Sequence, residues 1–152
     1  MASLLSVSQK CQYALRALFE LSARFETGKI TTVADIASSQ NIPIRFLEQI
    51  LNKIRTGGFI DSRRGKQGGY IMALAPSAIS VGEIIRFIEG PEDSIECIKN
   101  NRSSQCRFDM GCAFKDLWTR AKDSMTDIFD GTTFQDLVDK QKKSSKVVDY
   151  SI

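Results

Sequence analysis

The sequence of 152 residues contains no histidine. Histidine is the side chain most often used as a general base near neutral pH, so its absence disfavours acid–base catalysis. The sequence also lacks a Cys-x-x-Cys pair, a nucleotide-binding glycine loop and a βαβ pattern, which thiol oxidoreductases and nucleotide-dependent enzymes would need. We therefore expect that the protein is not an enzyme.

Long apolar runs are also missing. No stretch approaches the ~20 consecutive apolar residues that span a bilayer, and residues 1–25 lack the basic and apolar regions of a signal peptide. The composition, with 42% hydrophobic and 26% charged residues, is typical of a soluble globular protein. We expect a cytoplasmic protein with no membrane partner, in which clustered cysteines serve metal or redox chemistry more often than disulfides.

The first half of the chain has the periodicity of three helices. Apolar residues recur at three- and four-residue spacing over residues 8–25 and again over 43–56, where Pro43 suits the first helical position. Between these segments, Thr32 stands where the N-cap of a short helix is expected. The apolar positions are Tyr13, Ala14, Ala17, Leu18, Leu21 and Phe25 in the first helix, and Ile44, Leu47, Ile50, Leu51 and Ile54 in the third.

The stretch "FIDSRRGKQGGYIMAL", residues 59–74, predicts two short strands joined by a basic, glycine-rich turn. Its glycines permit the positive φ angles of a tight turn, so Arg63, Arg64 and Lys66 should project from an exposed tip. The order of these elements is that of a winged helix-turn-helix: a helix, a short helix, a turn, a third helix and a β-hairpin. The predicted fold class is therefore mainly α with a small β-hairpin.

The second half predicts a long helix with an apolar seam. Ser80 and Glu83 match a capping box that begins a helix ending at Gly90. Residues 113–129 are helical in pattern, with apolar side chains spaced four, three, four and three apart, which favours dimerisation through this helix. The seam consists of Phe114, Trp118, Ala121, Met125 and Ile128.

These patterns divide the chain into four parts. Residues 1–90 form a winged helix-turn-helix domain, 91–112 a cysteine-containing loop, and 113–140 the dimerisation helix with a short helix near 134–138. Residues 141–152 are polar and predict a flexible tail.

Basic side chains gather in the predicted third helix and hairpin. Residues 41–70 carry six basic and two acidic side chains, although the whole chain has a net charge of only +3. Such a stripe is the electrostatic footprint of a phosphate-binding surface, and it is also found on ordinary solvated faces. The polar positions of the third helix that should face outward are Arg45, Glu48, Gln49, Asn52 and Lys53.

Three of the four cysteines, Cys97, Cys106 and Cys112, lie in one polar segment, with eight residues between the first pair and five between the second. Thiolates are the usual ligands of iron–sulfur clusters. A zinc site is disfavoured, because zinc usually takes four protein ligands, often with a close Cys-x-x-Cys pair. A set of structural or reactive thiols remains the alternative.

The sequence resembles the IscR/NsrR/RirA/CymR group of dimeric bacterial winged-helix transcription regulators. The matching stretches are "YALRALFELS" (13–22), "TTVADIASSQNIPIRFLEQILNKIRTGGFI" (31–60), "SRRGKQGGYIMAL" (62–74) and "ISVGEIIRFIEGP" (79–91). In this group the third helix enters the DNA major groove and the hairpin reaches the adjacent minor groove. The resemblance assigns major-groove contacts to Arg45, Glu48 and Gln49 and a minor-groove contact to Arg64, while Arg63 lies beside it and Lys53 and Lys66 suit phosphates.

The resemblance also gives the cysteine segment a role. Members of the group with three cysteines there hold an iron–sulfur cluster, and Cys97, Cys106 and Cys112 match that branch in number and location. Whether the cluster is [2Fe–2S] or [4Fe–4S] stays open. Some relatives add a histidine just after the third cysteine, where this chain has Lys115, and others recruit a side chain of the partner subunit. The residue in that matching place is Gln12, with Cys11 beside it. The alternatives are that Cys11 is a small packed side chain and that a small molecule or no group at all completes the cluster.

The function implied is that of a homodimeric DNA-binding regulator that senses iron, redox state or nitric oxide through its cluster. The expected target is a near-palindromic operator in double-stranded DNA, since two equivalent recognition helices read two half-sites. The alternative is a cluster-free regulator of the same fold that responds through thiol oxidation or a partner protein.

Overall fold

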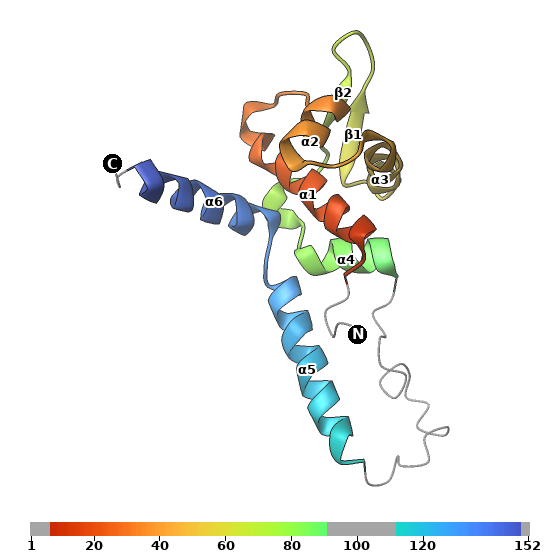
Figure 1. Cartoon of the computed structure of the whole chain (residues 1–152), viewed down its shortest axis with the longest axis vertical. Coiled ribbons are helices and arrows are strands. Elements are labelled where there is room, and N and C mark those ends of the chain that lie inside the picture. Colours follow the sequence, from red (N-terminus) through yellow and green to blue (C-terminus); the bar gives the residue numbers. More distant parts are fainter. Residues whose placement is uncertain (1–6, 91–111, 150–152) are drawn as a thin grey trace.

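The computed structural model describes residues 7–90 and 112–149 of the chain. Within these residues it contains six α-helices and one antiparallel two-stranded sheet, which confirms the mainly helical fold with a hairpin. Helices α1 to α4 and the hairpin form one unit, α5 projects from it as an arm, and α6 returns against α1 (Figure 1). No helix in the described part is long and apolar enough to cross a membrane.

The three N-terminal helices begin and end at local signals. Helix α1, Gln9–Ala23, follows Ser8, whose hydroxyl accepts a hydrogen bond from the Cys11 amide at 3.2 Å. The 3-10 turn Phe25–Thr27 precedes α2, Val33–Gln40, which Thr32 caps as predicted by accepting from the Asp35 amide at 3.1 Å. Helix α3, Ile44–Thr56, places Pro43 at the N-cap, one position earlier than predicted.

The hairpin is fastened to the helices at its base. Strands β1, Ile60–Arg63, and β2, Gly69–Met72, pair so that Ile60 lies opposite Met72, and both side chains are buried. Backbone hydrogen bonds between Thr31 and Tyr70, at 3.0 and 2.8 Å, add the segment before α2 to the sheet. At Gly69 a Cβ atom would collide with the carbonyl of Thr31, so this approach requires glycine.

The core lies between α1 and the helices around it. The small side chains of Ala14 and Ala17 are fully buried on α1 and permit close packing against its neighbours α2, α3, α4 and α6. Two apolar positions of the predicted helices lie outside this core. Phe25 is 41% exposed and Ile44 is 50% exposed, because each lies at or beyond the end of its helix, where no element of the described part of the chain covers it.

Helix α4 and the start of α6 hold the base of α5. After the 3-10 turn Pro76–Ala78, helix α4, Val81–Glu89, begins at Ser80, whose hydroxyl accepts from the Glu83 amide at 3.1 Å. Arg86 of α4 forms a 2.8 Å ion pair with Asp130 at the end of α5, Ala113–Asp130. The Val81 amide donates to the carbonyl of Thr132 at 2.9 Å. The end of α5 is therefore fixed to the start of α4.

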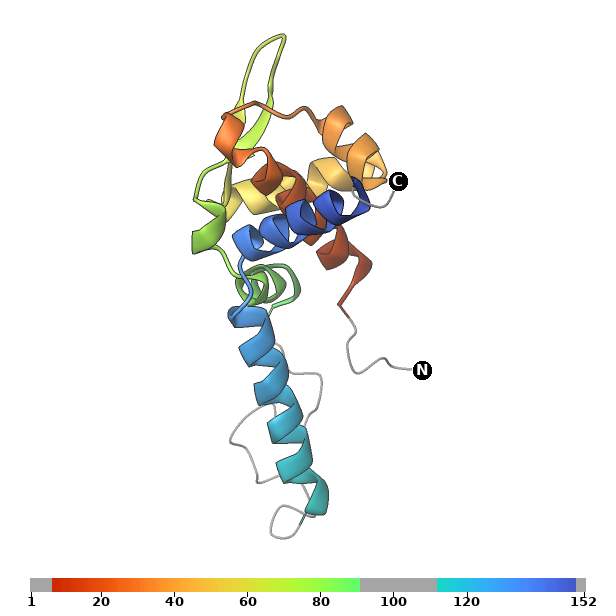
Figure 2. The ribbon, with the colours of Figure 1, turned by 90° about the vertical axis from the view of Figure 1, so that its left-hand side faces the viewer.

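The opposite end of α5 extends away from the helical unit (Figure 2). No residue of α5 is buried, and Phe114, Leu117 and Ile128 are 60%, 51% and 65% exposed. The rings of Phe114 and Trp118 stack with their centroids 6.2 Å apart. The helix predicted over 113–129 is confirmed, and its apolar seam has no partner within the chain's described residues.

Helix α6, Phe134–Asp149, is much longer than the short helix predicted near 134–138. Phe134 and Val138 are buried, which anchors its first two turns. Lys142 forms a 3.2 Å ion pair with Glu26 one turn further along. Residues 141–149, which were predicted to belong to a flexible tail, are therefore helical because tertiary contacts fix the preceding turns, while 150–152 lie outside the described residues.

Candidate nucleic-acid interface

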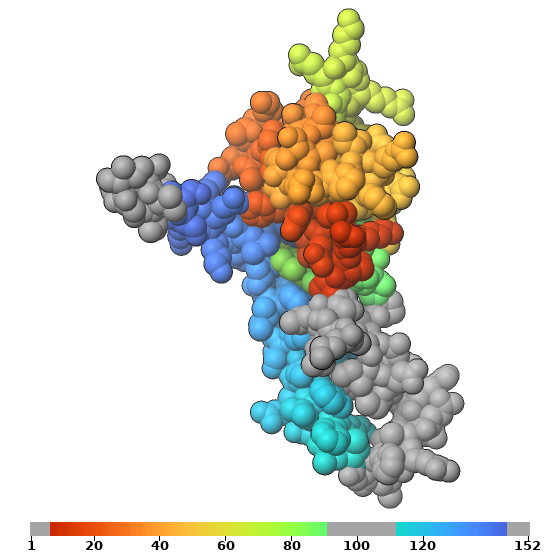
Figure 3. Space-filling model, in the orientation of Figure 1, coloured from red at the N-terminus to blue at the C-terminus, as the bar shows by residue number. Residues whose placement is uncertain are grey.

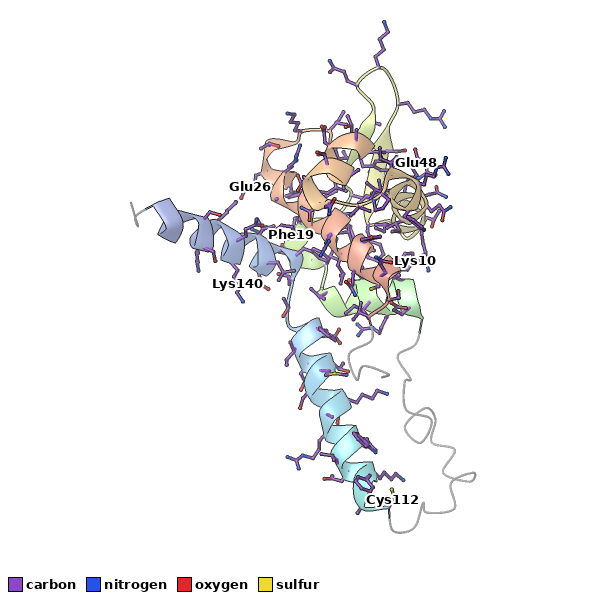
Figure 4. All side chains as sticks on the ribbon, in the orientation of Figure 1. Lys10, Phe19, Glu26, Glu48, Cys112 and Lys140 are labelled. Carbon is purple, nitrogen blue, oxygen red and sulfur yellow. The ribbon has the colours of Figure 1, made fainter. Side chains whose placement is uncertain are left out.

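Helix α3 presents a polar face to solvent opposite its buried stripe. Leu47, Ile50, Leu51 and Ile54 are at most 2% exposed, and they pack the helix against the core. The positions on the opposite side are all exposed, and Figure 4 shows Glu48 on α3 beside the hairpin. The exposed face comprises Arg45, Glu48, Gln49 and Asn52.

The hairpin tip carries the second group of charges. Arg63, Arg64 and Lys66 are exposed, and the hairpin tip projects beyond the rest of the molecule (Figure 3). Gly65 has a φ of 124°, the positive value that the turn was predicted to require. Because α3 leads into β1 through residues 57–59 and contacts it, the polar helix face and the cationic tip belong to one end of the molecule.

Lys53 differs from the other predicted DNA contacts. Its ammonium group donates a hydrogen bond to the carbonyl of Ile88 at 3.0 Å and lies 5.6 Å from the centre of the Phe87 ring. Both partners belong to the end of α4, where carbonyl groups attract a cation. In this structure Lys53 joins α3 to α4, and a phosphate contact by Lys53 stays a prediction.

Three further contacts converge on the end of α4. The Phe87 ring meets Phe59 edge-on at a centroid distance of 5.2 Å, and Gly57 lies so close to Phe87 that an added Cβ would come within 2.5 Å of its ring. The carboxylate of Glu89 accepts a hydrogen bond from the Ser8 amide at 2.8 Å. The last turn of α4 is thus bound both to α3 and to the start of α1.

A partly buried acid that sequence reasoning missed connects the first two helices. Glu20 of α1 forms a 2.6 Å ion pair with Arg24 and accepts a 2.8 Å hydrogen bond from the Gln40 amide group of α2. Burial acts to raise the pKa of Glu20, but the hydrogen bonds from Gln40 and Arg24 outweigh it and hold the pKa below its usual value. The ionised carboxylate therefore helps to fix α2, the helix that precedes α3, against α1.

Of the three clustered cysteines, only Cys112 falls within the described residues. It is the N-cap of α5 and is partly exposed, at the far end of α5 from the helical unit (Figure 4). Cys97 and Cys106 lie outside the described residues. Across residues 7–90 and 112–149, no three His, Cys, Asp or Glu side chains come together in a way that could hold a metal ion.

The two residues considered as a fourth ligand have different environments. Cys11 is 0% exposed and belongs to the core, which matches the alternative of a small packed side chain. Gln12 is exposed, and its amide group donates to the carbonyl of Val7 at 3.0 Å. Of the two, Gln12 is therefore the one with a solvent-exposed side chain.

Comparison with known proteins places this architecture in a known group. Residues 7–140 match the profile of the Rrf2 family, described as iron-dependent transcriptional regulators. The transcriptional regulator CymR of Bacillus subtilis is 32% identical over 133 residues, which cover 88% of this chain and 89% of CymR. Its solved structure, titled as that of the global cysteine regulator, superposes with a TM-score of 0.75 over 90% of this chain and 98% of that one.

Two further solved structures are similar. IscR of T. potens is 30% identical with a TM-score of 0.72, covering 95% of this chain and 93% of IscR. An oxidized form of Staphylococcus aureus CymR is 32% identical with a TM-score of 0.70, covering 88% of this chain and 96% of that one. Both confirm the winged helix-turn-helix arrangement predicted from the sequence.

Arg64→Ala and Glu48→Ala should impair DNA binding in different ways. Loss of the Arg64 charge should weaken binding to every duplex and reduce the salt slope by about one. Loss of Glu48 should mainly reduce the difference in binding free energy between the preferred base pair and the other base pairs at one position, by about 1–3 kcal/mol. Fluorescence anisotropy would compare a duplex selected from a random pool with a random duplex, using Lys140→Ala on α6 as the control. Equal losses on both duplexes for Glu48→Ala would refute its role in base selection.

Lys53→Met should lower the stability of the fold. The substitution keeps the aliphatic stem but removes the ammonium group bound to the Ile88 carbonyl, which should reduce the free energy of unfolding by about 1–2 kcal/mol. The matched variant Lys66→Met, at the exposed tip, should change it by less than about 0.5 kcal/mol. Urea denaturation measures both. Equal stabilities of the two variants would show that the contact with α4 contributes nothing.

Proposed function

Because the chain belongs to the Rrf2 family of transcriptional regulators, we propose that it is a homodimeric sensor in which Cys97, Cys106 and Cys112 hold an iron–sulfur cluster. The observation that carries this proposal is the position of the cysteine segment. The segment joins the end of α4, which is bonded to α3, to the start of the exposed helix α5. A cytoplasmic location accompanies this proposal, since the target is DNA.

The DNA-facing residues have side chains suited to their proposed partners. Arg45 can bind a guanine edge or a phosphate, Gln49 can pair with an adenine edge, and Glu48 can accept from the cytosine amino group. Arg64 at the hairpin tip can enter a narrow minor groove, where the negative potential is strongest. Arg63 and Lys66 are placed on the same tip for phosphate contacts, which add affinity without sequence preference.

Cys112 fits the proposed ligand role. It is partly exposed and is the N-cap of α5, and the N-terminus of a helix favours a negative charge such as that of a thiolate. A bound cluster would supply sensitivity to iron, oxidants or nitric oxide. For the fourth ligand, the exposed Gln12 of the partner subunit suits the proposal better than the buried Cys11, and a small molecule would serve equally.

The second subunit is proposed to cover α5. An unpartnered stripe of Phe114, Trp118, Met125 and Ile128 on an arm-like helix suits antiparallel or parallel pairing with the same helix of another copy. The C-terminal end of α5 is bonded to α4, and α4 is bonded to α3. Pairing of two α5 helices would therefore fix the distance between the two copies of α3. Two such helices related by a two-fold axis would read a near-palindromic operator.

Coordination by the cysteines would then change DNA affinity through α4. Ligation at Cys97, Cys106 and Cys112 would link the residues between Glu89 and α5 through one group, and the end of α4 is bonded to α3 by Lys53. Coupling between two such sites is usually worth about 1–3 kcal/mol. If the cluster changes the affinity for DNA by a certain factor, DNA must change the affinity for the cluster by the same factor.

A second candidate function is a cluster-free regulator whose thiols respond directly. The similarity to CymR, a regulator solved in an oxidized form, favours this alternative. The two candidates differ in colour: the cluster-bearing protein should absorb visible light after anaerobic purification, and the thiol-based protein should not.

Replacement of any one of Cys97, Cys106 or Cys112 by serine should abolish or greatly weaken the visible absorption, because each would remove one ligand. Cys11→Ser should keep the absorption, since Cys11 is packed in the core. Anaerobic reconstitution followed by an absorption spectrum and by iron and sulfide assays provides the measurement. A wild-type protein that takes up neither iron nor sulfide would contradict the proposal and favour the thiol-based alternative.

Met125→Glu should disrupt the dimer. In a paired α5 the new carboxylate would be buried without a partner, which costs several kcal/mol. Ser124→Glu introduces the same charge at an exposed position next to the seam and should leave the dimer intact. Sedimentation at micromolar concentration measures both, and a dimeric Met125→Glu protein would show that α5 doesn't pair through this seam.

A further inference from the structure

The first turn of α3 exposes two large apolar side chains. Ile44 is 50% exposed and Phe46 is 59% exposed, although the remaining apolar residues of this helix are buried. The buried stripe begins at Leu47, so the first turn projects beyond the core that covers the rest of the helix. An exposed phenylalanine does not contribute the stabilising free energy that its burial would provide, so its exposed position calls for an explanation.

Both side chains border the polar face of the helix. Arg45 lies between them in the sequence, Glu48 follows Ile44 by one turn, and Gln49 follows Phe46 by three residues. Residues three and four apart are neighbours on a helix surface. Phe46 therefore lies beside Gln49, at the edge of the face that is proposed to read bases.

The major groove offers one apolar feature, the C5 methyl group of thymine, and recognition helices contact base edges with their N-terminal residues. We propose that Phe46 is a specificity-determining residue that packs on a thymine methyl group in the major groove. This inference rests on the proposed DNA-binding function of α3. Gln49 next to it suits adenine, so the two side chains together favour an A·T pair or two adjacent A·T pairs.

A protein partner is the competing occupant of this surface. The apolar seam of α5 lies on the projecting arm, away from α3 (Figure 1), so pairing of α5 with the same helix of a second copy does not by itself account for the exposure of Phe46. The basic tip of the hairpin next to α3 favours a polyanion over an apolar protein surface. Both observations favour DNA over a protein as the occupant.

The test uses the full chain and a duplex selected by the wild-type protein from a random pool. Each thymine of the two half-sites is replaced by deoxyuridine, which removes only the C5 methyl group. Replacement of the contacted thymine in one half-site should weaken wild-type binding about four-fold, the value of one buried methyl group. Replacement of that thymine in both half-sites should weaken it about fifteen-fold. Phe46→Ala should bind the thymine and uracil duplexes equally, and Phe46→Leu should keep part of the preference.

Phe25→Ala serves as the matched control, since Phe25 is also an exposed phenylalanine, 41% exposed, and lies beyond the end of α1. It should keep the full thymine preference. The inference is overturned if wild-type binding is indifferent to every thymine replacement, or if Phe46→Ala keeps the wild-type preference. Loss of dimerisation in Phe46→Ala would assign the residue to a protein interface instead. If the wild-type protein selects no sequence at all, the proposed function fails together with this inference.

Discussion

The last turn of α4 is the constraint on which the arrangement of the molecule depends. There the ammonium group of Lys53 binds the Ile88 carbonyl at 3.0 Å, the Phe87 ring packs against Phe59, and Glu89 accepts from the Ser8 amide. A cation at a helix C-terminus is favoured by the carbonyl groups that lack helical partners. These contacts set the position of α3, and therefore of its polar face, relative to the point where the cysteine segment begins.

Helix α4 also holds the base of α5. Arg86 pairs with Asp130, and backbone hydrogen bonds from residues 81 and 134 close the joint between α4, α5 and α6. Helix α4 thus contacts both the base of α5 and, through its last turn, helix α3. A change in the cysteine segment, which follows the last turn of α4 and precedes α5 in the sequence, would act on both the proposed dimer contact and the proposed DNA contact.

Local signals made much of this fold predictable. The buried stripe from Leu47 to Ile54, the caps at Thr32 and Ser80 and the glycine turn of the hairpin each depend on residues close in sequence, and all are confirmed. The length of α6 depends instead on Phe134 and Val138 docking in the core. Lys53 likewise turns to a carbonyl 35 residues away, which helical periodicity cannot reveal. The roles of the DNA-facing side chains and the three cysteines remain predictions, since they concern partners outside the chain.

The most direct test of the account is the affinity of one selected duplex for the anaerobically reconstituted protein and for the same protein after cluster removal. If ligation of the cysteine segment is transmitted through α4 to α3, the two affinities should differ by roughly 5- to 150-fold, the usual range for coupled sites. Equal affinities of the loaded and cluster-free proteins, for every duplex that the protein selects, would contradict the proposed coupling.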